Sequence, residues 1–244
     1  MINRFFDNAD MNNATGFLHH SMDGSKWLVT AKHILFSCEK NGLPFTRINV
    51  MFSSTKPWVY LPIPFREMRK YGKIHVNEKV DIAIIKINQM LEGRYNVQTE
   101  YNNFEFFDDS IITDHIPKGD DSVSVTGYPE KDINWNKTSL KRLDGKVIAC
   151  PTKDKVRARD HADHNPSIDY CFCIDKPVEK GMSGSPVISI SDDNSKCKLA
   201  GICIARLEND DGSIGGAAIP SHYIRDIIDH GRDLASYLDQ FEFG

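Results

Sequence analysis

The sequence predicts an all-β fold made of antiparallel barrels and closed by one α-helix at its C-terminal end. Short runs rich in Val, Ile, Phe and Tyr alternate with clusters of Gly, Pro, Asn and Asp over the first 220 residues. Helical patterns are missing between these runs, so βαβ units with parallel strands are not expected. A single amphipathic pattern follows the last of these runs and predicts the closing helix.

The composition is that of a folded globular protein. The 244 residues allow one large domain or two packed subdomains, and 40% of them are hydrophobic and 26% charged, near the average for globular chains. The net charge of -4, without long runs of one sign, provides no basic surface for a nucleic acid or an anionic membrane. We therefore expect neither of these as a partner.

The first half of the chain contains five expected strands. Each is short, rich in β-branched or aromatic residues and bounded by turn-forming residues. These strands are expected at Gly16–His20, Lys26–Thr30, Arg47–Phe52, Trp58–Leu61 and Val80–Ile87. We assign residues 1–105 to an N-terminal β-barrel subdomain.

The second half contains six further expected strands. A polar connection over residues 88–121 precedes them, and its turn-prone composition suits a link between subdomains. The strands are expected at Ser122–Gly127, Leu140–Ala149, Ile168–Ile174, Pro186–Ile190, Leu199–Ala205 and Gly215–Ile219. We assign residues 106–220 to a C-terminal β-barrel subdomain.

The last segment, residues 221–244, is predicted to be a helix that packs on the barrels. Ser221 is the expected N-cap, since serine is favoured where a helix begins. The apolar residues that recur along one face of this helix are Ile224, Ile227, Ile228, Leu234 and Leu238. We interpret this face as one that docks on the protein's own barrel.

The six cysteines include no CxxC pair. The first fifteen residues lack the apolar core of a secretory signal, and no run approaches the roughly 20 apolar residues of a spanning helix. We therefore expect a cytoplasmic protein whose cysteines are free thiols. Cys171 and Cys173 would point the same way on one strand, which disfavours a bond between them. His161 and His164 with these cysteines match no defined zinc spacing, so neither a metal nor a cofactor is expected.

One segment ends an apolar strand with a histidine, in the sequence WLVTAKH that closes at His33. An imidazole at a strand exit can accept a proton and return it near neutral pH. A second segment opens an apolar run with Asp81, in DIAIIKI. Aspartate is depleted in strands and costly to bury alone, so a specific partner is expected, and a histidine N–H would serve.

A third segment, KGMSGSPV over residues 180–187, places Ser183 between two glycines. Glycine permits the left-handed backbone that can turn successive N–H groups toward one point, which a developing oxyanion requires. Each segment also has an ordinary structural interpretation when it is considered alone. These are a strand-end histidine, an aspartate at a turn and a Gly/Ser turn.

Together the three segments resemble the chymotrypsin-like serine proteases, whose catalytic histidine, aspartate and serine occur in this chain order. TAKH, DIAIIKI and GMSGSP are similar to the TAxH, DIAL-type and GxSGxP signatures of that family. GFL at residues 16–18 is similar to the family's opening strand, and GGAAIPS at 215–221 to a segment of HtrA-type bacterial peptidase domains, here without a PDZ domain. The resemblance implies two six-stranded antiparallel Greek-key β-barrels with a C-terminal α-helix.

The resemblance also implies a mechanism. Ser183 would attack the peptide carbonyl and form an acyl-enzyme, His33 would act as general base and then acid, and Asp81 would orient the histidine. The backbone N–H groups of Gly181 and Ser183 would form the oxyanion hole. The strand edge at Ile204–Arg206 would pair with an extended substrate through main-chain hydrogen bonds.

Several positions depart from the family pattern. Met182 replaces the aspartate that receives a new N-terminus in secreted digestive members, so activation by trimming is not expected. Pro177 replaces the carboxylate of trypsin-type members, which disfavours cleavage after Lys or Arg. Ile204 replaces a hydroxyl that contacts the aspartate in many relatives. Asp81 is therefore expected to find a second contact among backbone N–H groups near His33.

The substrate side chain is expected to meet residues of three segments. The expected substrate-binding residues are Pro177, Val178, Ile204, Ala205, Arg206, Gly216 and Ala217. Val178, Gly216 and Ala217 favour a small or medium apolar pocket, which is our expectation. Arg206 near the expected rim would instead favour an acidic side chain.

The predicted function is that of an intracellular serine endopeptidase acting on protein or peptide substrates. Because the sequence given ends after the helix, gating is expected from a regulatory protein partner, an oligomer or the connection over residues 88–121. The alternative is a catalytically silent protease-fold module that binds extended peptides at its strand edge. An esterase or a peptidoglycan-active hydrolase shares the acyl-transfer chemistry but has no separate support in the sequence.

Overall fold

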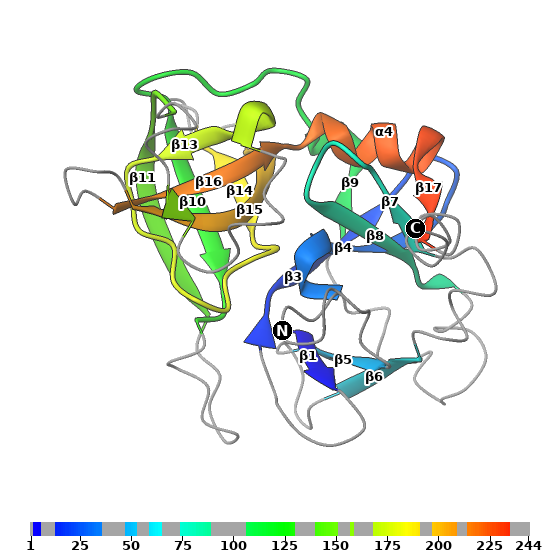
Figure 1. The fold of residues 1–244 in the computed structure, drawn as a ribbon. Helices are drawn as coiled ribbons and strands as arrows, with labels where there is room; N and C mark the ends of the chain where they lie inside the picture. The colour runs from blue at the N-terminus through cyan, green and yellow to red at the C-terminus, as the bar shows by residue number, and fades with distance from the viewer. Residues whose placement is uncertain are drawn as a thin grey trace, which may run out of the picture.

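A computed structural model provides the structure of the protein. It describes residues 2–5, 13–35, 47–52, 59–64, 74–88, 106–129, 140–150, 157–158, 168–190, 197–208 and 214–234. In this part of the chain nearly all regular structure is β-strand, and a single α-helix lies toward the C-terminal end (Figure 1). The predicted all-β class is confirmed.

The C-terminal half forms a closed barrel. Its strands run in the order β12-β15-β14-β10-β11-β13-β16, and β16 pairs back with β15 to close the sheet. The bounds are β10 Ser122–Gly127, β11 Lys141–Ile148, β12 Arg157–Ala158, β13 Phe172–Ile174, β14 Pro186–Ser189, β15 Lys198–Glu208 and β16 Ile214–Pro220. Buried side chains such as Val123, Val187 and Ala218 fill its interior, because inward and outward residues alternate along each strand.

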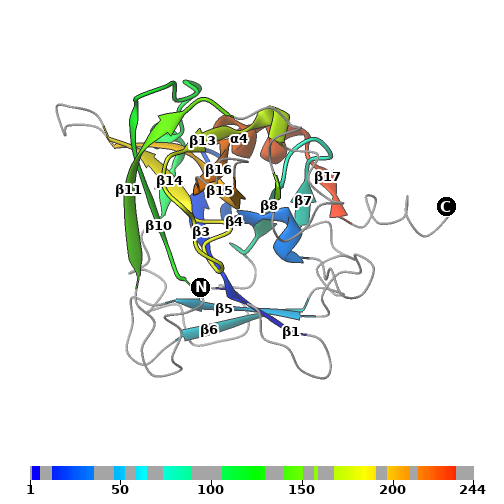
Figure 2. The same cartoon turned by 60° about the vertical axis from the view of Figure 1, so that its left-hand side comes forward.

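The N-terminal half contributes two sheets within the described ranges, and both lie on the right in Figure 1. The larger sheet has the order β17-β7-β8-β4-β3-β9 and the smaller one the order β2-β1-β5-β6. The bounds are β1 Ile2–Phe5, β2 Asn13–Ala14, β3 Gly16–His20, β4 Lys26–Ala31, β5 Arg47–Phe52, β6 Val59–Pro64, β7 Ile74–Val76, β8 Ile82–Lys86, β9 Phe107–Asp108 and β17 Arg232–Asp233. The second view separates the smaller sheet, below, from the rest (Figure 2).

The central strands of the larger sheet explain why the two apolar segments of the first half come together. β4 and β8 run antiparallel, and Val29 pairs with Ile84 and Ala31 with Ile82. These side chains are fully buried, which is why both segments read as almost continuous apolar runs. The register places the residues that follow Ala31 beside the residue that precedes Ile82.

The predicted helix is present as α4, His222–His230, and it packs on β7 and β8 of the N-terminal half. Ile224 and Ile227 are buried, so the apolar face docks on the protein itself. Ser221 precedes the helix but makes no side-chain cap. Ser221 is thus the N-cap residue, as predicted, but its hydroxyl donates to the carbonyl of Leu199 at 2.5 Å and ties the start of the helix to β15.

Several short elements were not predicted. β1, β7, β9, β12 and β17 each have four residues or fewer, too few for a periodic pattern. A 3-10 turn at Ile168–Tyr170 occupies the start of one predicted strand, and β13 begins only at Phe172. β9 pairs in parallel with β3, so this strand lies in the N-terminal sheet. The boundary after residue 105 stays a prediction, and this pairing would move it beyond Asp108.

The structure corrects the expectation of free thiols at two positions. Cys150 and Cys173 form a disulfide with their Cα atoms 5.1 Å apart, and it joins the end of β11 to β13. The strand register explains their meeting, because Ile148 pairs with Cys173. Cys171 and Cys203 form no disulfide in the part of the chain that the structure describes, and burial raises the pKa of the Cys203 thiol to about 12.

The disulfide bears on the expected compartment. Such bonds are rare in cytosolic proteins, so the cytoplasmic location stays a prediction that Cys150–Cys173 does not favour. Among the described residues no helix is both long and apolar enough to cross a membrane. His161 and His164, considered above for a metal site, lie outside the described residues.

Candidate active site

His33 and Asp81 are in direct contact at the end of the central strands. His33 lies in a 3-10 turn, Lys32–Leu35, directly after β4, and Asp81 directly precedes β8. The Nδ1 atom of His33 is 2.5 Å from Oδ2 of Asp81, and the backbone N–H of His33 donates to Oδ1 at 2.8 Å. This second bond is the backbone contact that the sequence predicted for Asp81. One carboxylate therefore fixes both the ring and the backbone of the histidine.

Lys32 supports the same junction from the buried side. Only 8% of it is exposed, its backbone N–H donates to the carbonyl of Asp81, and its Nζ donates to the carbonyl of Asn77 at 2.8 Å. Burial lowers the pKa of Lys32, and the nearby carboxylates of Asp81 and Glu78 counteract part of that effect. Lys32 thus anchors the short connection that carries Asp81.

Ser183 lies in a pair of consecutive turns between β13 and β14. The Met182 N–H donates to the Glu179 carbonyl, with Gly181 in the third position at φ +94°. The Ser185 N–H donates to the Met182 carbonyl, with Gly184 in the third position at φ +88°. A positive φ at this position is what a type II turn requires, and glycine adopts it without strain.

Tight packing of this segment against the N-terminal half also requires glycine at position 184. A Cβ atom at this position would lie 2.0 Å from the backbone oxygen of Thr15 and 2.5 Å from Oγ1 of Thr30. Thr30 lies on β4, three residues before His33. The turn of Ser183 therefore lies against the strand that leads to the histidine.

Thr15 joins the two halves at the Ser183 turn. Its N–H donates to the carbonyl of Ser183 at 2.9 Å, and its hydroxyl donates to the carbonyl of Gly181 at 2.9 Å. The same hydroxyl accepts the Tyr128 N–H at 3.0 Å, and Thr15 is 2% exposed. Nothing in the local pattern around Thr15 distinguishes it from other threonines, so this role could not be predicted from the sequence.

The hydroxyl of Ser183 contacts the predicted substrate strand. It donates to the carbonyl of Ile204 in β15 at 3.3 Å. The Gly184 N–H donates to the carbonyl of Cys203 at 2.7 Å, and the Cys203 N–H returns a bond to the carbonyl of Ser185. These bonds place the strand edge that begins at Ile204 directly beside Ser183.

The predicted substrate-binding residues divide into buried and accessible positions. Val178, Ile204 and Ala217 are at most 3% exposed, Ala205 and Arg206 are half-buried, and Pro177 is exposed. Ala205 pairs with Ala217 and Arg206 with Gly216 across β15 and β16. A Cβ at Gly216 would lie 2.4 Å from Cγ2 of Val178. The strand pairing and this close approach therefore bring together Val178, Arg206 and Gly216. The core instead contains Ile204 and Ala217.

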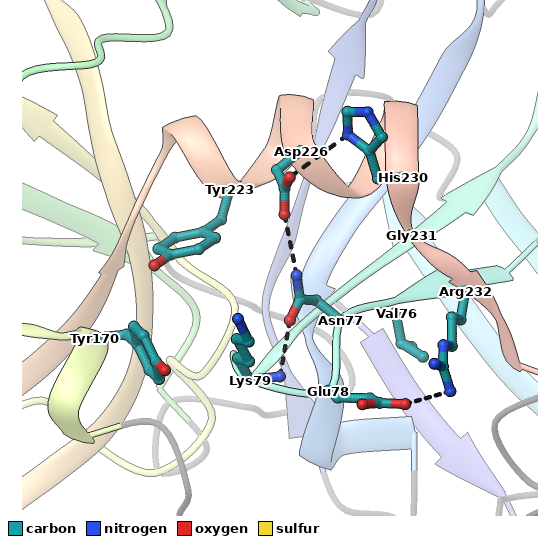
Figure 3. Close-up of a pocket in the computed structure, with 10 residues that line it drawn as sticks. All are labelled: Val76, Asn77, Glu78, Lys79, Tyr170, Tyr223, Asp226, His230, Gly231 and Arg232. Carbon is teal, nitrogen blue, oxygen red and sulfur yellow. Dashed lines mark hydrogen bonds and ion pairs between the residues drawn. The ribbon is translucent and has the colours of Figure 1, made fainter.

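A separate cavity of about 270 Å³ lies between the β7–β8 connection and α4 (Figure 3). It is lined by Val76, Asn77, Glu78, Lys79, Tyr170, Tyr223, Asp226, His230, Gly231 and Arg232. Several of its polar groups contact one another: Arg232 lies 2.5 Å from Glu78, and Asp226 accepts the Asn77 amide at 3.0 Å. None of the predicted site residues lines it.

Known proteins share this architecture. Residues 5–228 match the protein family described as Trypsin. Among solved structures, the chain is similar to protease Anisep from Arthrobacter nicotinovorans, with 15% identity, a TM-score of 0.59, and coverage of 96% of this chain and 93% of that one. It is also similar to the active form of the Rv3671c protease from M. tuberculosis, with 14% identity, a TM-score of 0.57, and coverage of 93% and 78%. No curated protein matches the chain.

The fold and the comparisons define a protease of the trypsin-like class. The chain belongs to the trypsin family, whose match spans nearly its whole length. At the identities found, the likeness to the two solved proteases concerns the fold alone. The roles of individual residues in this chain therefore have to be argued from their own contacts.

Proposed function

We propose that the protein is a serine endopeptidase that cleaves peptide bonds through Ser183, His33 and Asp81. The contact of both Asp81 oxygens with His33, at 2.5 and 2.8 Å, carries this proposal. A carboxylate held on Nδ1 leaves the other ring nitrogen to accept a proton and stabilises the imidazolium that then forms. A purely structural aspartate at this turn would not need both contacts.

The reaction divides among the three residues. Ser183 attacks the substrate carbonyl while His33 removes the hydroxyl proton, and the tetrahedral intermediate collapses to an acyl-enzyme as His33 gives that proton to the leaving amine. Water then attacks the acyl-enzyme with His33 again as the base. Asp81 keeps the histidine in the tautomer that this cycle needs.

The backbone N–H groups of Gly181 and Ser183 are the proposed oxyanion donors. The two successive turns with positive φ at Gly181 and Gly184 support this role, because such turns orient neighbouring N–H groups toward one side. Thr15 holds the carbonyls of Gly181 and Ser183 from the opposite side. Loss of one oxyanion donor generally costs about 100- to 1,000-fold in kcat.

The proposed substrates are protein or peptide chains that lie along the β15 edge near Ile204. A segment in extended conformation can add its main-chain hydrogen bonds to an exposed strand edge, and side chains then select among sequences. A substrate bound in this way would have the carbonyl to be attacked beside Ser183, whose hydroxyl contacts the carbonyl of Ile204.

A serine-directed fluorophosphonate probe tests the nucleophile. The wild-type protein is expected to be labelled once, at Ser183, and Ser183→Ala to remain unlabelled. Ser185→Ala is the matched control, because this buried hydroxyl lies two residues away in the same turn and should not affect labelling. Labelling that persists in Ser183→Ala would contradict the assignment.

A peptide-library experiment distinguishes the endopeptidase from the alternative, a catalytically silent module that binds peptides. Peptide libraries incubated with the protein and read by mass spectrometry are expected to show products that Ser183→Ala does not form. Peptides that bind both proteins and are cut by neither would support the module instead.

A further inference from the structure

Arg206 carries a charge that no described residue neutralises. It lies on β15 and is half-buried, and its Nε atom is buried without a hydrogen-bond partner. No ion pair joins it to any other side chain that the structure describes. A guanidinium cannot release its proton, and an unpaired buried donor is unfavourable to folding. The Nε atom of Arg206 therefore lacks an acceptor among the residues that the structure describes.

The acidic residues of the adjoining segment already have partners. Glu179 pairs with Lys141, and one oxygen of Asp175 accepts the backbone N–H of Lys146 at 2.8 Å. The other oxygen of Asp175 lies 3.8 Å from Nζ of Lys176. These two carboxylates are engaged with other groups, so neither of them is the acceptor that Nε of Arg206 lacks.

The direction of the Arg206 side chain follows from strand register. Arg206 pairs with Gly216, and directly paired residues of antiparallel strands project from the same face. The Cβ direction of Gly216 points at Cγ2 of Val178. Arg206 therefore projects from the face that meets Val178, and Gly216 has no side chain that would occupy the same space.

This place lies next to the proposed nucleophile. The carbonyl of Ile204, two residues before Arg206, accepts the hydroxyl of Ser183 at 3.3 Å. Two residues of strand advance by about 7 Å, a distance that an arginine side chain spans. Val178 lies five residues before Ser183 and forms the facing wall. A substrate side chain directly before the cleaved bond would enter between these two residues.

We propose that Arg206 binds the carboxylate of a glutamate or aspartate directly before the cleaved bond, so that the enzyme cuts after acidic residues. This inference rests on the proposed endopeptidase function. Arginine donates two parallel N–H groups to one carboxylate, which is a strong and directional pairing. The buried side chain of Val178 limits water around the pair and strengthens it.

Matched quenched peptides that differ only before the cleaved bond test the preference. Wild-type kcat/KM is expected to be at least about 10-fold higher for Glu than for Gln, since a charge-assisted pair is lost with the amide. Arg206→Gln is expected to remove the difference between the two peptides, chiefly because kcat/KM for the Glu peptide falls. Arg206→Lys is expected to keep part of the preference. Arg142→Gln is the matched control, because that arginine is exposed on β11.

A second readout does not depend on turnover. Peptides that end in Glu or Gln at the same position are titrated into Ser183→Ala protein, and the Glu peptide is expected to bind at least about 10-fold more tightly. Adding Arg206→Gln should remove that difference. Equal binding, or no binding of either peptide, would overturn the role of Arg206.

The two proposals fail in different ways. Fluorophosphonate labelling at Ser183 combined with equal cleavage after Glu and Gln, or with a preference for apolar residues, overturns the acidic specificity and leaves the endopeptidase in place. Absence of labelling overturns the endopeptidase, and the binding measurement then still decides whether Arg206 recognises a carboxylate.

Discussion

The two oxygens of Asp81 contact two different atoms of His33, with Oδ2 at the ring Nδ1 and Oδ1 at the backbone N–H. The backbone bond fixes the position of the His33 main chain, and the ring bond fixes the orientation of its imidazole. Because Ala31 and Ile82 are paired immediately beside them, the strand register sets both contacts.

Asp81→Asn should separate these two contacts. The amide oxygen can still accept the His33 N–H, but the NH₂ group then faces Nδ1 and favours the wrong tautomer. We expect kcat/KM to fall by about 10⁴-fold with little change in thermal stability. Kinetics on a cleaved peptide and thermal unfolding measure the two effects. Asp144→Asn, at an exposed carboxylate, serves as the control, and full activity in Asp81→Asn would contradict the proposed role.

Thr15→Val should loosen the turn of the proposed nucleophile. Valine keeps the shape of threonine but leaves the Gly181 carbonyl and the Tyr128 N–H without their partner. We expect the free energy of unfolding to fall by about 2 kcal/mol and kcat to fall more than KM rises. Thr15→Ser retains the hydroxyl and should restore most of both quantities. A Thr15→Val protein with unchanged kcat would show that the bond does not position the turn.

His19 should make the fold sensitive to mild acid. Its side chain is fully buried on β3, with Nε2 3.1 Å from Oδ1 of Asp109. Burial lowers its pKa below 6.5, and the nearby carboxylate offsets only part of this. The unfolded chain therefore binds a proton more readily, so stability is complete above pH 6.5 and is lost as pH falls from there toward the lowered pKa.

Denaturant unfolding at pH 7.5 and 5.5 measures this effect. The wild-type free energy of unfolding should fall by up to about 1.4 kcal/mol per pH unit in that window. His19→Gln should remove most of the slope, whereas His20→Gln, at the exposed neighbouring position, should retain it. Equal slopes in wild type and His19→Gln would refute the prediction.

The Cys150–Cys173 disulfide should contribute measurably to stability. It closes a loop between residues 23 apart in sequence, and a crosslink of this length stabilises by about 3 kcal/mol. Replacing both cysteines by serine should lower the free energy of unfolding by that amount, and dithiothreitol should do the same to the wild type. Cys197→Ser, at an exposed free thiol, should have no effect. Insensitivity of the wild type to reduction would indicate that the bond does not form.

Features that depend on local pattern could be predicted from the sequence. The strands at Arg47–Phe52 and Ser122–Gly127 lie at their predicted bounds, because alternating apolar residues and flanking turn residues define them. The contact of His33 with Asp81 follows from two apolar runs that pair at the centre of one sheet.

Features that depend on proximity in space could not be predicted. The cysteines of the disulfide are joined by a strand register that their spacing does not encode. The role of Thr15 depends on partners more than 100 residues away. The sequence indicates Arg206 as a substrate-binding residue, but the unpartnered Nε atom of its side chain is a feature of the folded structure. The apolar pocket expected from Val178, Gly216 and Ala217 stays a prediction that the peptide series will decide.

The hydrogen bonds from Thr15 to the Ser183 turn have a consequence for the synthesis of the protein. The first half of the chain leaves the ribosome long before the segment around Ser183, and β15 follows later still. The proposed reactive centre can assemble only after both halves have been made and have docked. The order of translation would therefore delay the proposed peptide cleavage until the segment around Ser183 and β15 have been synthesised and folded.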